Sequence, residues 1–399
     1  MIKGSKRAKS QMLAVGVAAL LAMIVGACSS DSKTAATSAA SSSGSTSPVS
    51  QAQQQLDTHT GDLKKVAAPY LAQLTPLKAV PPKGKKIIYV SPPLTGALAI
   101  GDTIKQASDE LGWTYSLVQS AGSAPDQVNS AFDQAIQQHP DLIVHIAGDA
   151  VANATAFEAT KAAGIPVIEE AYPGPTTGMT GNGIIGAVNT PADAQTLGEA
   201  FTSWAFVDAG GQSFDVAYTR FSAIPATATT GDAVEKHLKA VCSDCGFTNL
   251  ESQTTEIGKA IPGQIVSAVR ANPKIKYVVA PLASAFTGVP AALATAGLPD
   301  VKLLVTGGDQ STFSGISGGT IAMAVVNNYF YTGWRLIDVA ARFFTGGDPL
   351  EGTSAAQLPA QVVDKATVTP ALATDFNKAF SDDFTTSGID VSFKKLWGI

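Results

Sequence analysis

The sequence predicts an α/β protein made of two doubly wound lobes, and three observations support this prediction. Short apolar runs alternate with longer segments whose apolar residues recur at helical spacing. The alternation forms two successive series that meet at Gly210-Gly211, and repeated strand–helix units build parallel sheets with right-handed crossovers. The 399 residues, 45 % hydrophobic and 15 % charged, are enough for two cores.

The N-terminal residues have the pattern of an export signal. A basic segment precedes an apolar run at 12–25, which is shorter than the roughly 20 residues that a membrane-spanning helix needs. The following Val25-Gly26-Ala27-Cys28 resembles the bacterial lipobox. We therefore expect residues 1–27 to be a lipoprotein signal peptide and an acylated Cys28 to anchor the chain in the lipid bilayer. The alternative is an ordinary signal peptide with an incidental cysteine.

Two segments without a clear strand or helix pattern follow. Between Ser29 and Ser50, ten of the 22 residues are serine, a composition typical of a flexible chain that buries little surface. We predict a flexible, Ser-rich tether at 28–60. Residues 61–84 are expected to be a partly helical lead-in, to which the sequence assigns no role.

The first strand–helix series begins near residue 85. We predict its strands at 87–90, 142–146, 165–168 and 184–188. Helices are predicted through 104–111, after the capping sequence 123–126, at 151–163 and after Thr190-Pro191.

The second series gives strands at 214–218, 250–255, 277–280, 301–306 and 321–326. Its helices are predicted through 234–238, through 265–269, at 291–296 and at 329–344. Ligands of doubly wound sheets bind at the carboxyl ends of the strands. The binding site is therefore expected in the cleft between the lobes.

Four segments in order carry a resemblance to a known family. They are Lys86-Ile-Ile-Tyr-Val-Ser91, Ala163-Gly-Ile-Pro-Val-Ile168, Val305-Thr-Gly-Gly-Asp309 and Gly319-Thr-Ile-Ala-Met-Ala-Val-Val-Asn327. Together they resemble the type I periplasmic binding proteins, especially the ribose-binding members, from about residue 85 to 369. The resemblance implies two Rossmann-like lobes that close on a solute, joined by a hinge that the chain crosses three times.

The same resemblance implies domain boundaries. The crossings would lie near 208–212, 326–330 and 355–360. Lobe 1 would then comprise 85–209 with 328–356, and lobe 2 would comprise 210–327 with 357–399.

The resemblance also implies ligand-binding positions. Asp309 stands where the sugar binders keep an aspartate, and Asn327 stands where they keep a glutamine. The other family positions are occupied differently here, by Thr95, Ala97, Leu98, Ala171, Tyr172, Ala228, Ile257 and Leu282. From these positions we predict a ligand set of Thr95, Leu98, Tyr172, Ile257, Leu282, Asp309 and Asn327.

The replacements change the expected solute. Both family arginines are missing, and arginine supplies the bidentate hydrogen bonds that satisfy buried hydroxyls. We therefore expect a sugar-like solute that is either less polar than a plain pentose or hexose or partly aromatic. Arg220 and Glu170 either add charge to the site or lie on the surface.

The remaining cysteines form a C-x-x-C motif at Cys242 and Cys245. A redox centre or half a zinc site is possible chemistry for this motif, but neither a second cysteine pair nor a histidine pair completes a metal site. An exported chain favours a small local disulfide.

Other functional classes are disfavoured by the sequence. The segment Gly181–Gly186 matches G-x-G-x-x-G, but a strand follows it where a dinucleotide site needs one before it. The four histidines are dispersed and no nucleophile motif is present, so we expect neither enzymatic activity nor a cofactor. Without the predicted leader, 23 basic residues stand against 32 acidic ones, and this excess argues against nucleic acid as a partner.

The function expected from these observations is capture of a small-molecule solute by a monomer for an ABC-type membrane permease. Two alternatives use the same fold. One is a ligand sensor that presents its closed form to a membrane receptor, and the other is an exported enzyme.

Overall fold

The computed structural model describes residues 47–146, 151–174, 179–352 and 355–399. The predicted signal peptide at 1–27 and the predicted lipidation of Cys28 lie outside these residues. None of the helices within the described ranges combines the length and apolar character needed to cross a bilayer.

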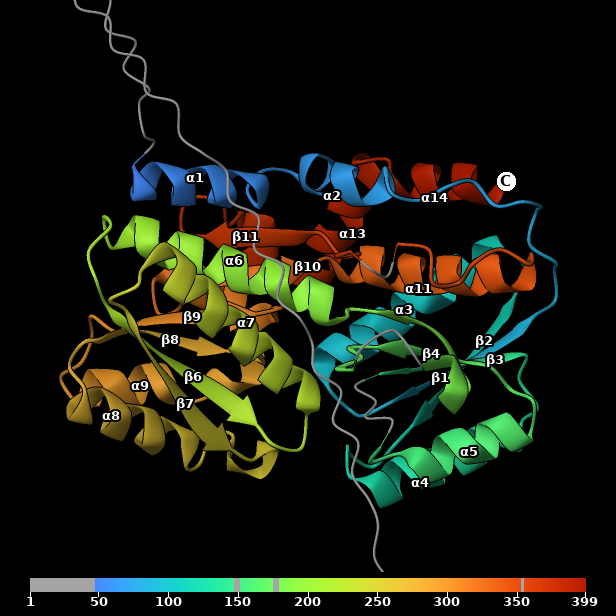
Figure 1. The fold of residues 1–399 in the computed structure, drawn as a ribbon, viewed down its shortest axis with the longest axis horizontal. Helices are drawn as coiled ribbons and strands as arrows, with labels where there is room; N and C mark the ends of the chain where they lie inside the picture. The colour runs from blue at the N-terminus through green and yellow to red at the C-terminus, as the bar shows by residue number, and fades with distance from the viewer. Residues whose placement is uncertain (1–46, 147–150, 175–178, 353–354) are drawn as a thin grey trace, which may run out of the picture. The chain divides into compact units, whose positions relative to one another are not determined.

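Lobe 1 is built on a five-stranded parallel sheet of order β2-β1-β3-β4-β5 (Figure 1). Its strands are β1 (Lys86–Ser91), β2 (Thr114–Gln119), β3 (Leu142–Ile146), β4 (Val167–Glu170) and β5 (Ile184–Val188), with the 3₁₀ helix η1 (Met179–Asn182) before the last. Helices α3 (Thr95–Glu110) and α11 (Tyr329–Phe344) cover one face, and α4 (Pro125–Ile136) and α5 (Ala154–Ala162) cover the other.

Lobe 2 is built on a six-stranded sheet of order β11-β10-β9-β8-β6-β7, in which only β11 runs antiparallel to its neighbour. Its strands are β6 (Asp215–Phe221), β7 (Gly246–Ser252), β8 (Ile275–Ala280), β9 (Lys302–Thr306), β10 (Met323–Asn327) and β11 (Ala360–Asp364). Helices α6 (Pro191–Asp208) and α7 (Pro225–Val241) cover one face. The other face is covered by α8 (Ile261–Ala271), α9 (Val289–Thr295) and α10 (Gln310–Gly318), with the 3₁₀ helices η2 (Thr254–Glu256) and η3 (Ala283–Phe286) in the connections.

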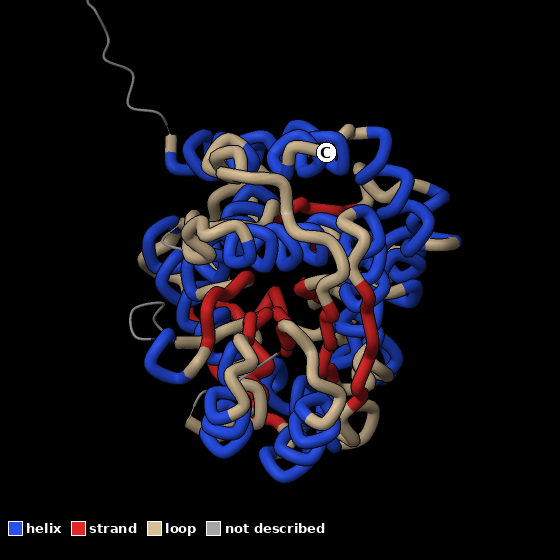
Figure 2. The backbone as a smooth tube through the Cα atoms, turned by 90° about the vertical axis from the view of Figure 1, so that its right-hand side faces the viewer, coloured by secondary structure: helices blue, strands red, loops and turns tan. Residues whose placement is uncertain are grey.

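The predicted fold class is confirmed: two α/β lobes carry helices on both faces of a mainly parallel sheet (Figure 2). The apolar runs of the sequence form central strands that are buried on both faces, as in β1, where Ile87 through Ser91 are all buried. This burial explains why continuous apolar runs, rather than alternating patterns, marked the strands.

The first connection between the lobes differs from the predicted one at 208–212. Helix α6 belongs to lobe 2, because its Leu197 and Phe201 pack with Val234 of α7 in the lobe 2 core. A Cβ atom on Gly198 would lie 2.7 Å from the Ala233 backbone, so this glycine permits the close approach of α6 to α7. The chain therefore enters lobe 2 between β5 and α6, about one helix earlier than predicted.

The predicted tether at 28–60 ends earlier than expected. Residues Pro48–Thr58 form helix α1, and its Ala52 and Leu56 are buried in the lobe 2 core beside Phe201 of α6. The rest of the predicted tether lies outside the described residues. In the lead-in, α2 (Leu63–Leu71) buries Leu63 in the core of lobe 1.

The C-terminal residues also depart from the predicted division, which placed 357–399 in lobe 2. After α12 (Pro370–Thr374), helix α13 (Phe376–Thr386) begins in the lobe 2 core with Phe376 and ends in the lobe 1 core with Phe384. Helix α14 (Ile389–Trp397) then packs on lobe 1, where Trp397 stacks on Trp334 of α11 with ring centroids 5.2 Å apart. The chain thus crosses between the lobes once more, within α13.

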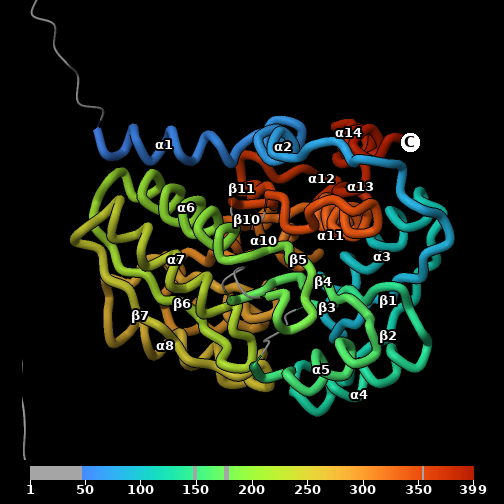
Figure 3. Tube along the Cα trace, turned by 45° about the vertical axis from the view of Figure 1, so that its right-hand side comes forward, coloured from blue at the N-terminus to red at the C-terminus, as the bar shows by residue number. Residues whose placement is uncertain are grey.

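Helices from both ends of the described chain lie along the same side of the molecule. In Figures 1 and 3, α1, α2 and α14 form a row beside β11, α6 and α11. Because α1 packs on lobe 2 whereas α2 and α14 pack on lobe 1, this row spans both lobes.

One buried carboxylate ties two of the connections together. Asp193, at the start of α6, accepts hydrogen bonds at Oδ1 from the backbone N–H groups of Gln357 (2.6 Å) and Leu358 (2.8 Å), which lead into β11. Its Oδ2 accepts a bond from the N–H of Thr190 (2.8 Å). Asp193 is 1 % exposed, and burial raises the pKa of its carboxyl despite these bonds.

The two remaining cysteines form a disulfide in the structure. Cys242 and Cys245 follow α7, and their Cα atoms lie 5.4 Å apart. Cys245 is fully buried, and its sulfur accepts a hydrogen bond from the Phe214 N–H at 3.3 Å. The disulfide thereby fixes the loop between α7 and β7 against the start of β6.

Candidate functional site

A cavity of about 420 Å³ lies between the lobes at the carboxyl ends of the strands, where ligands of doubly wound sheets bind. Lobe 1 contributes Thr95 and Glu170, and lobe 2 contributes Leu282 and Thr306. The connection residue Asn327 completes this set. The volume falls in the range of sites for small molecules.

Five of the seven predicted ligand residues line this cavity: Thr95, Tyr172, Leu282, Asp309 and Asn327. The structure does not bring Leu98 or Ile257 to the lining. Helix α3 lines the cavity with Ile100, and residues two apart on a helix point about 200° apart, so Leu98 is directed elsewhere. Ile257 packs against the lobe 2 core.

Asp309 has a structural role at the edge of the cavity. It caps the N-terminus of α10, where its Oδ1 accepts hydrogen bonds from the Thr312 N–H (2.9 Å), the Thr312 hydroxyl (3.1 Å) and the Ser311 hydroxyl (2.7 Å). These bonds orient the carboxylate. Its Oδ2 accepts no hydrogen bond from the described residues and is the oxygen left for a ligand.

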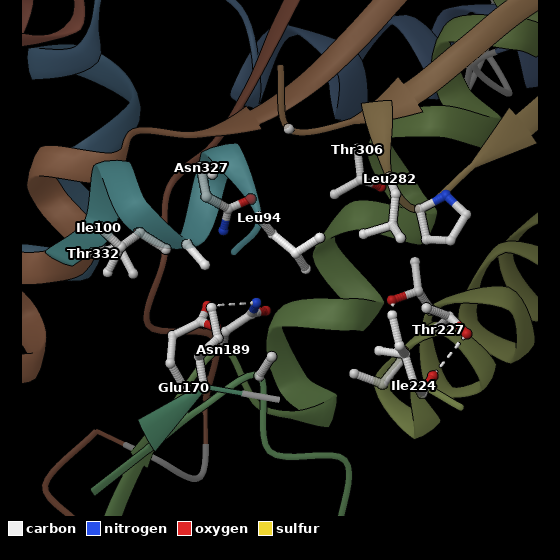
Figure 4. A pocket seen from close by; sticks show the side chains of 18 of the residues that line it. Leu94, Ile100, Glu170, Asn189, Ile224, Thr227, Leu282, Thr306, Asn327 and Thr332 are labelled. Atoms are coloured by element: carbon white, nitrogen blue, oxygen red, sulfur yellow. Dashed lines mark hydrogen bonds between the residues drawn. The ribbon is translucent and has the colours of Figure 1, made fainter. Parts of the chain in front are cut away.

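Glu170 lines the cavity at the end of β4 and is only 4 % exposed. Its Oε1 accepts a hydrogen bond from Asn189 Nδ2 at 3.0 Å (Figure 4). Burial raises the pKa of Glu170 to about 7, and the nearby carboxylates of Asp193 and Glu169 act in the same direction. From the sequence, Glu170 could belong either to the site or to the surface. Its position at the end of a predicted strand was a signal that favoured the site.

Two polar atoms at the cavity are buried without a hydrogen-bond partner among the described residues: Asn327 Nδ2 and Thr306 Oγ1. Figure 4 shows both side chains beside the open space. An unsatisfied buried polar group costs roughly 1–3 kcal/mol. A solute with hydroxyl or carbonyl oxygens would remove that cost. Thr306 was not predicted, because a threonine ending a strand carries no distinctive pattern.

Much of the remaining lining is apolar. Leu94 and Ile100 of lobe 1 face Ile224 and Leu282 of lobe 2 across the cavity (Figure 4). Tyr329, which the sequence analysis missed as a site residue, donates its hydroxyl hydrogen bond to the Gly308 carbonyl oxygen at 2.9 Å. Burial raises the pKa of the Tyr329 phenol to about 12, so this side chain joins α11 to the lobe 2 loop as a neutral group.

Other candidate groups lie outside the cavity. Arg220 is near Glu251 (3.6 Å) and Asp232 (3.9 Å), and its side chain is partly exposed. His145 lies in the lobe 1 core with its Nδ1 3.0 Å from Glu169 Oε1. Within the described ranges, no three His, Cys, Asp or Glu side chains converge as a metal site would require.

Gly181–Gly186 spans η1 and the start of β5. The glycine-rich segment therefore precedes a strand instead of opening a helix, and it lacks the backbone geometry that binds a pyrophosphate.

Solved structures of bacterial solute-binding proteins share this fold. A carbohydrate transporter protein of Acidothermus cellulolyticus in complex with myo-inositol has 18 % identity and a TM-score of 0.60, covering 75 % of this chain and 99 % of its own. An ABC transporter solute-binding protein of Agrobacterium vitis with bound allitol has 20 % identity and a TM-score of 0.60, covering 72 % and 97 %. One from Mycobacterium smegmatis with bound glycerol has 18 % identity and a TM-score of 0.60, covering 71 % and 96 %.

The sequence comparison agrees with the structural one. No curated protein matches the chain, whereas the family model of the periplasmic binding protein domain matches residues 87–348, more than half of the sequence. The match covers β1 through α11 and includes the strand ends and connections that form most of the cavity lining. The chain therefore belongs to the family of proteins with a periplasmic binding protein domain.

Proposed function

We propose that this protein is an extracytoplasmic solute-binding protein that captures a small molecule in the cavity between its lobes and delivers it to an ABC importer. The observation that carries the proposal is the cavity itself. Its unpartnered polar atoms, Asn327 Nδ2 and Thr306 Oγ1, lie where the two lobes meet. A solute that bonds to both atoms would favour the closed arrangement.

The chemistry of the lining supports a polyol-sized solute with an apolar side. The structural neighbours were solved with myo-inositol, allitol and glycerol. Here the described lining offers Thr95, Asn189, Asn327 and Asp309 for hydroxyls, together with the apolar Leu94, Ile224 and Leu282. This mixture is consistent with a solute less polar than a plain sugar.

The proposal includes membrane attachment through an acylated Cys28, which rests on the lipobox-like Val25-Gly26-Ala27-Cys28. Replacement Cys28→Ala in the producing cell should move the protein from the membrane to the soluble fraction. Protein that stays with the membrane after this change would contradict the anchor.

Binding is tested by thermal denaturation with a panel of polyols, cyclitols, sugars, nucleosides and aromatic acids. A bound solute at 100 times its Kd stabilises the folded state by about 2.7 kcal/mol, and X-ray scattering should show the protein becoming more compact. The charge-removing variant Glu158→Gln, at an exposed position of α5, serves as a control that should bind equally. Absence of both stabilisation and compaction across the panel would contradict the proposed function.

A further inference from the structure

We propose that the solute carries a positively charged amino group on a polyol-sized skeleton, and that Glu170 is the counter-ion for this group. The inference rests on the proposed function of the cavity and specifies its substrate class.

The charge of the cavity lining favours a cationic solute. Among the described residues that line the cavity, Glu170 and Asp309 are ionisable acids, and none is lysine, arginine or histidine. The internal stretches outside the structure, 147–150, 175–178 and 353–354, contain no basic residue in the sequence either. An anionic solute would therefore meet two carboxylates and no cation, whereas a cationic one would neutralise them.

The surroundings of Glu170 contain acidic and neutral groups. The titratable groups that act on it are Glu169 on its own strand, Asp193 of α6, Tyr89 of β1 and Tyr329 of α11. All of these are acidic or neutral. Its neighbour Glu169, by contrast, faces the lobe 1 core and pairs with His145. A carboxylate this buried normally has a charged partner, and none of the residues that the structure describes supplies one to Glu170.

The hydrogen-bond donors and acceptors of the cavity suit a solute that carries both an ammonium group and hydroxyls. Glu170 Oε1 is held by Asn189, while Oε2 accepts no hydrogen bond from the described residues. On the other side of the space, Asn327 presents an unpartnered N–H donor (Figure 4). An ammonium group has three donors and forms strong charge-assisted bonds with carboxylates. A hydroxyl oxygen elsewhere on the same molecule would accept from Asn327.

This arrangement couples binding to pH. The pKa of Glu170 in the empty cavity is about 7, and an ammonium group beside it favours the ionised form, so binding near neutral pH releases a proton. The affinity for an amine should rise roughly tenfold from pH 6 to pH 8, as the ionised fraction of Glu170 rises. An alkylammonium group with a pKa near that of the lysine side chain stays protonated across this interval, so the pH dependence is followed with an open-chain primary amine.

The test compares solutes that differ only in the amino group. Isothermal titration of the full chain with D-glucitol against D-glucamine, and with scyllo-inositol against scyllo-inosamine, should give at least tenfold tighter binding of each amine. Titrations in buffers of different ionisation enthalpy should show proton release. In Glu170→Gln the preference should shrink to about threefold or less, whereas Glu158→Gln, which removes one exposed charge of the same lobe, should keep it.

The outcomes separate this inference from the function on which it rests. If the neutral member of a pair binds as tightly as its amine, or if the preference survives in Glu170→Gln, the charge assignment is wrong and solute binding stands. If neither pair binds but another solute of the wider panel does, the substrate class is wrong. If nothing binds and no compaction occurs, both proposals fail.

Discussion

Two buried carboxylates of lobe 1, Asp338 and Glu170, have different surroundings. On α11, Asp338 is fully buried and accepts hydrogen bonds from Arg335 Nη1 (2.9 Å), Arg342 Nε (2.8 Å) and Trp397 Nε1 (2.9 Å). At the cavity, Glu170 is nearly as buried but has one neutral partner, Asn189.

The different partners of Asp338 and Glu170 indicate different roles for the two carboxylates. Removing a carboxylate from water costs several kcal/mol in either place. On α11 two arginines offset that cost, and the indole of Trp397 adds a bond that fixes α14 to lobe 1. At the cavity the cost is offset by a proton, as the raised pKa of Glu170 indicates. The first arrangement holds the fold together, and the second leaves a carboxyl group that the proposed amine would ionise and pair with.

The largest expected effect comes from the α11 site. Replacement Asp338→Asn leaves Arg335 and Arg342 buried without their shared counter-charge, and we expect the free energy of unfolding to fall by about 3–5 kcal/mol. Chemical denaturation at pH 7 measures it. As a control, the exposed Glu158→Gln should leave the denaturation midpoint unchanged. A fall in the free energy of unfolding of less than about 1 kcal/mol in Asp338→Asn would show that the two sites do not differ as described.

The second largest effect is expected for Glu170→Gln, which should raise the free energy of unfolding instead of lowering it. Because the folded-state pKa of Glu170 is about 7 and its ordinary value is 4.5, the folded protein holds a proton that the unfolded chain releases between these values. The contribution of Glu170 to stability therefore falls as pH rises through that window. Glu170→Gln should be more stable than the natural protein by roughly 3 kcal/mol at pH 8, with little difference at pH 4.

The free energy of unfolding of the natural protein and of Glu170→Gln, measured by chemical denaturation from pH 4 to pH 8, checks this expectation. Parallel curves, or an advantage of the variant that grows toward low pH, would mean that the pKa of Glu170 is not raised in the folded protein.

The smallest effect on stability is expected at the unpartnered atoms. Thr306→Val removes a buried hydroxyl with no partner among the described residues and preserves the side-chain shape, so the free energy of unfolding should rise by about 1 kcal/mol, the lower end of the cost of an unsatisfied buried polar group. Solute affinity, in contrast, should fall several-fold, because in the proposed site this hydroxyl bonds to the ligand. Unchanged affinity, measured by titration with the best solute of the panel, would remove Thr306 from the site.

The sequence predicted the central strands of both sheets and the edge strands β5 and β7, but it missed the other two edge strands, β2 and β11. Strands such as β1 are buried on both faces and appear as continuous apolar runs. The edge strand β2 has mostly exposed or half-buried side chains, so its pattern resembles a loop, and β11 is short and antiparallel. Neither was predicted.

The lobe boundaries were harder to predict, for a physical reason. Apolar residues at helical spacing showed that 191–208 is a helix, but they do not specify the sheet against which its Leu197 and Phe201 pack. The same holds for α14, whose Trp397 meets Trp334 far away in the sequence. Assignment of a helix to a lobe depends on such contacts.

For the site, family resemblance and strand ends gave different information. Resemblance placed Asp309 and Asn327 at the cavity, where they lie. It also suggested Leu98 and Ile257, which the structure places elsewhere, because a shift of one position on a helix or loop redirects a side chain. The rule that ligands bind at strand ends would have favoured Glu170 and Thr306, and the burial of these residues was not readable from sequence.

The bonds of Asp193 have a mechanical consequence. One carboxylate holds N–H groups from the segment that enters lobe 2 and from the segment that leads into β11. Sliding these segments past each other would break the bonds from Gln357 and Leu358, whereas rotation about the carboxylate preserves them. The lobes of this protein should therefore pivot about a fixed point, so that the cavity changes in width while the residues on its two walls stay opposite the same neighbours.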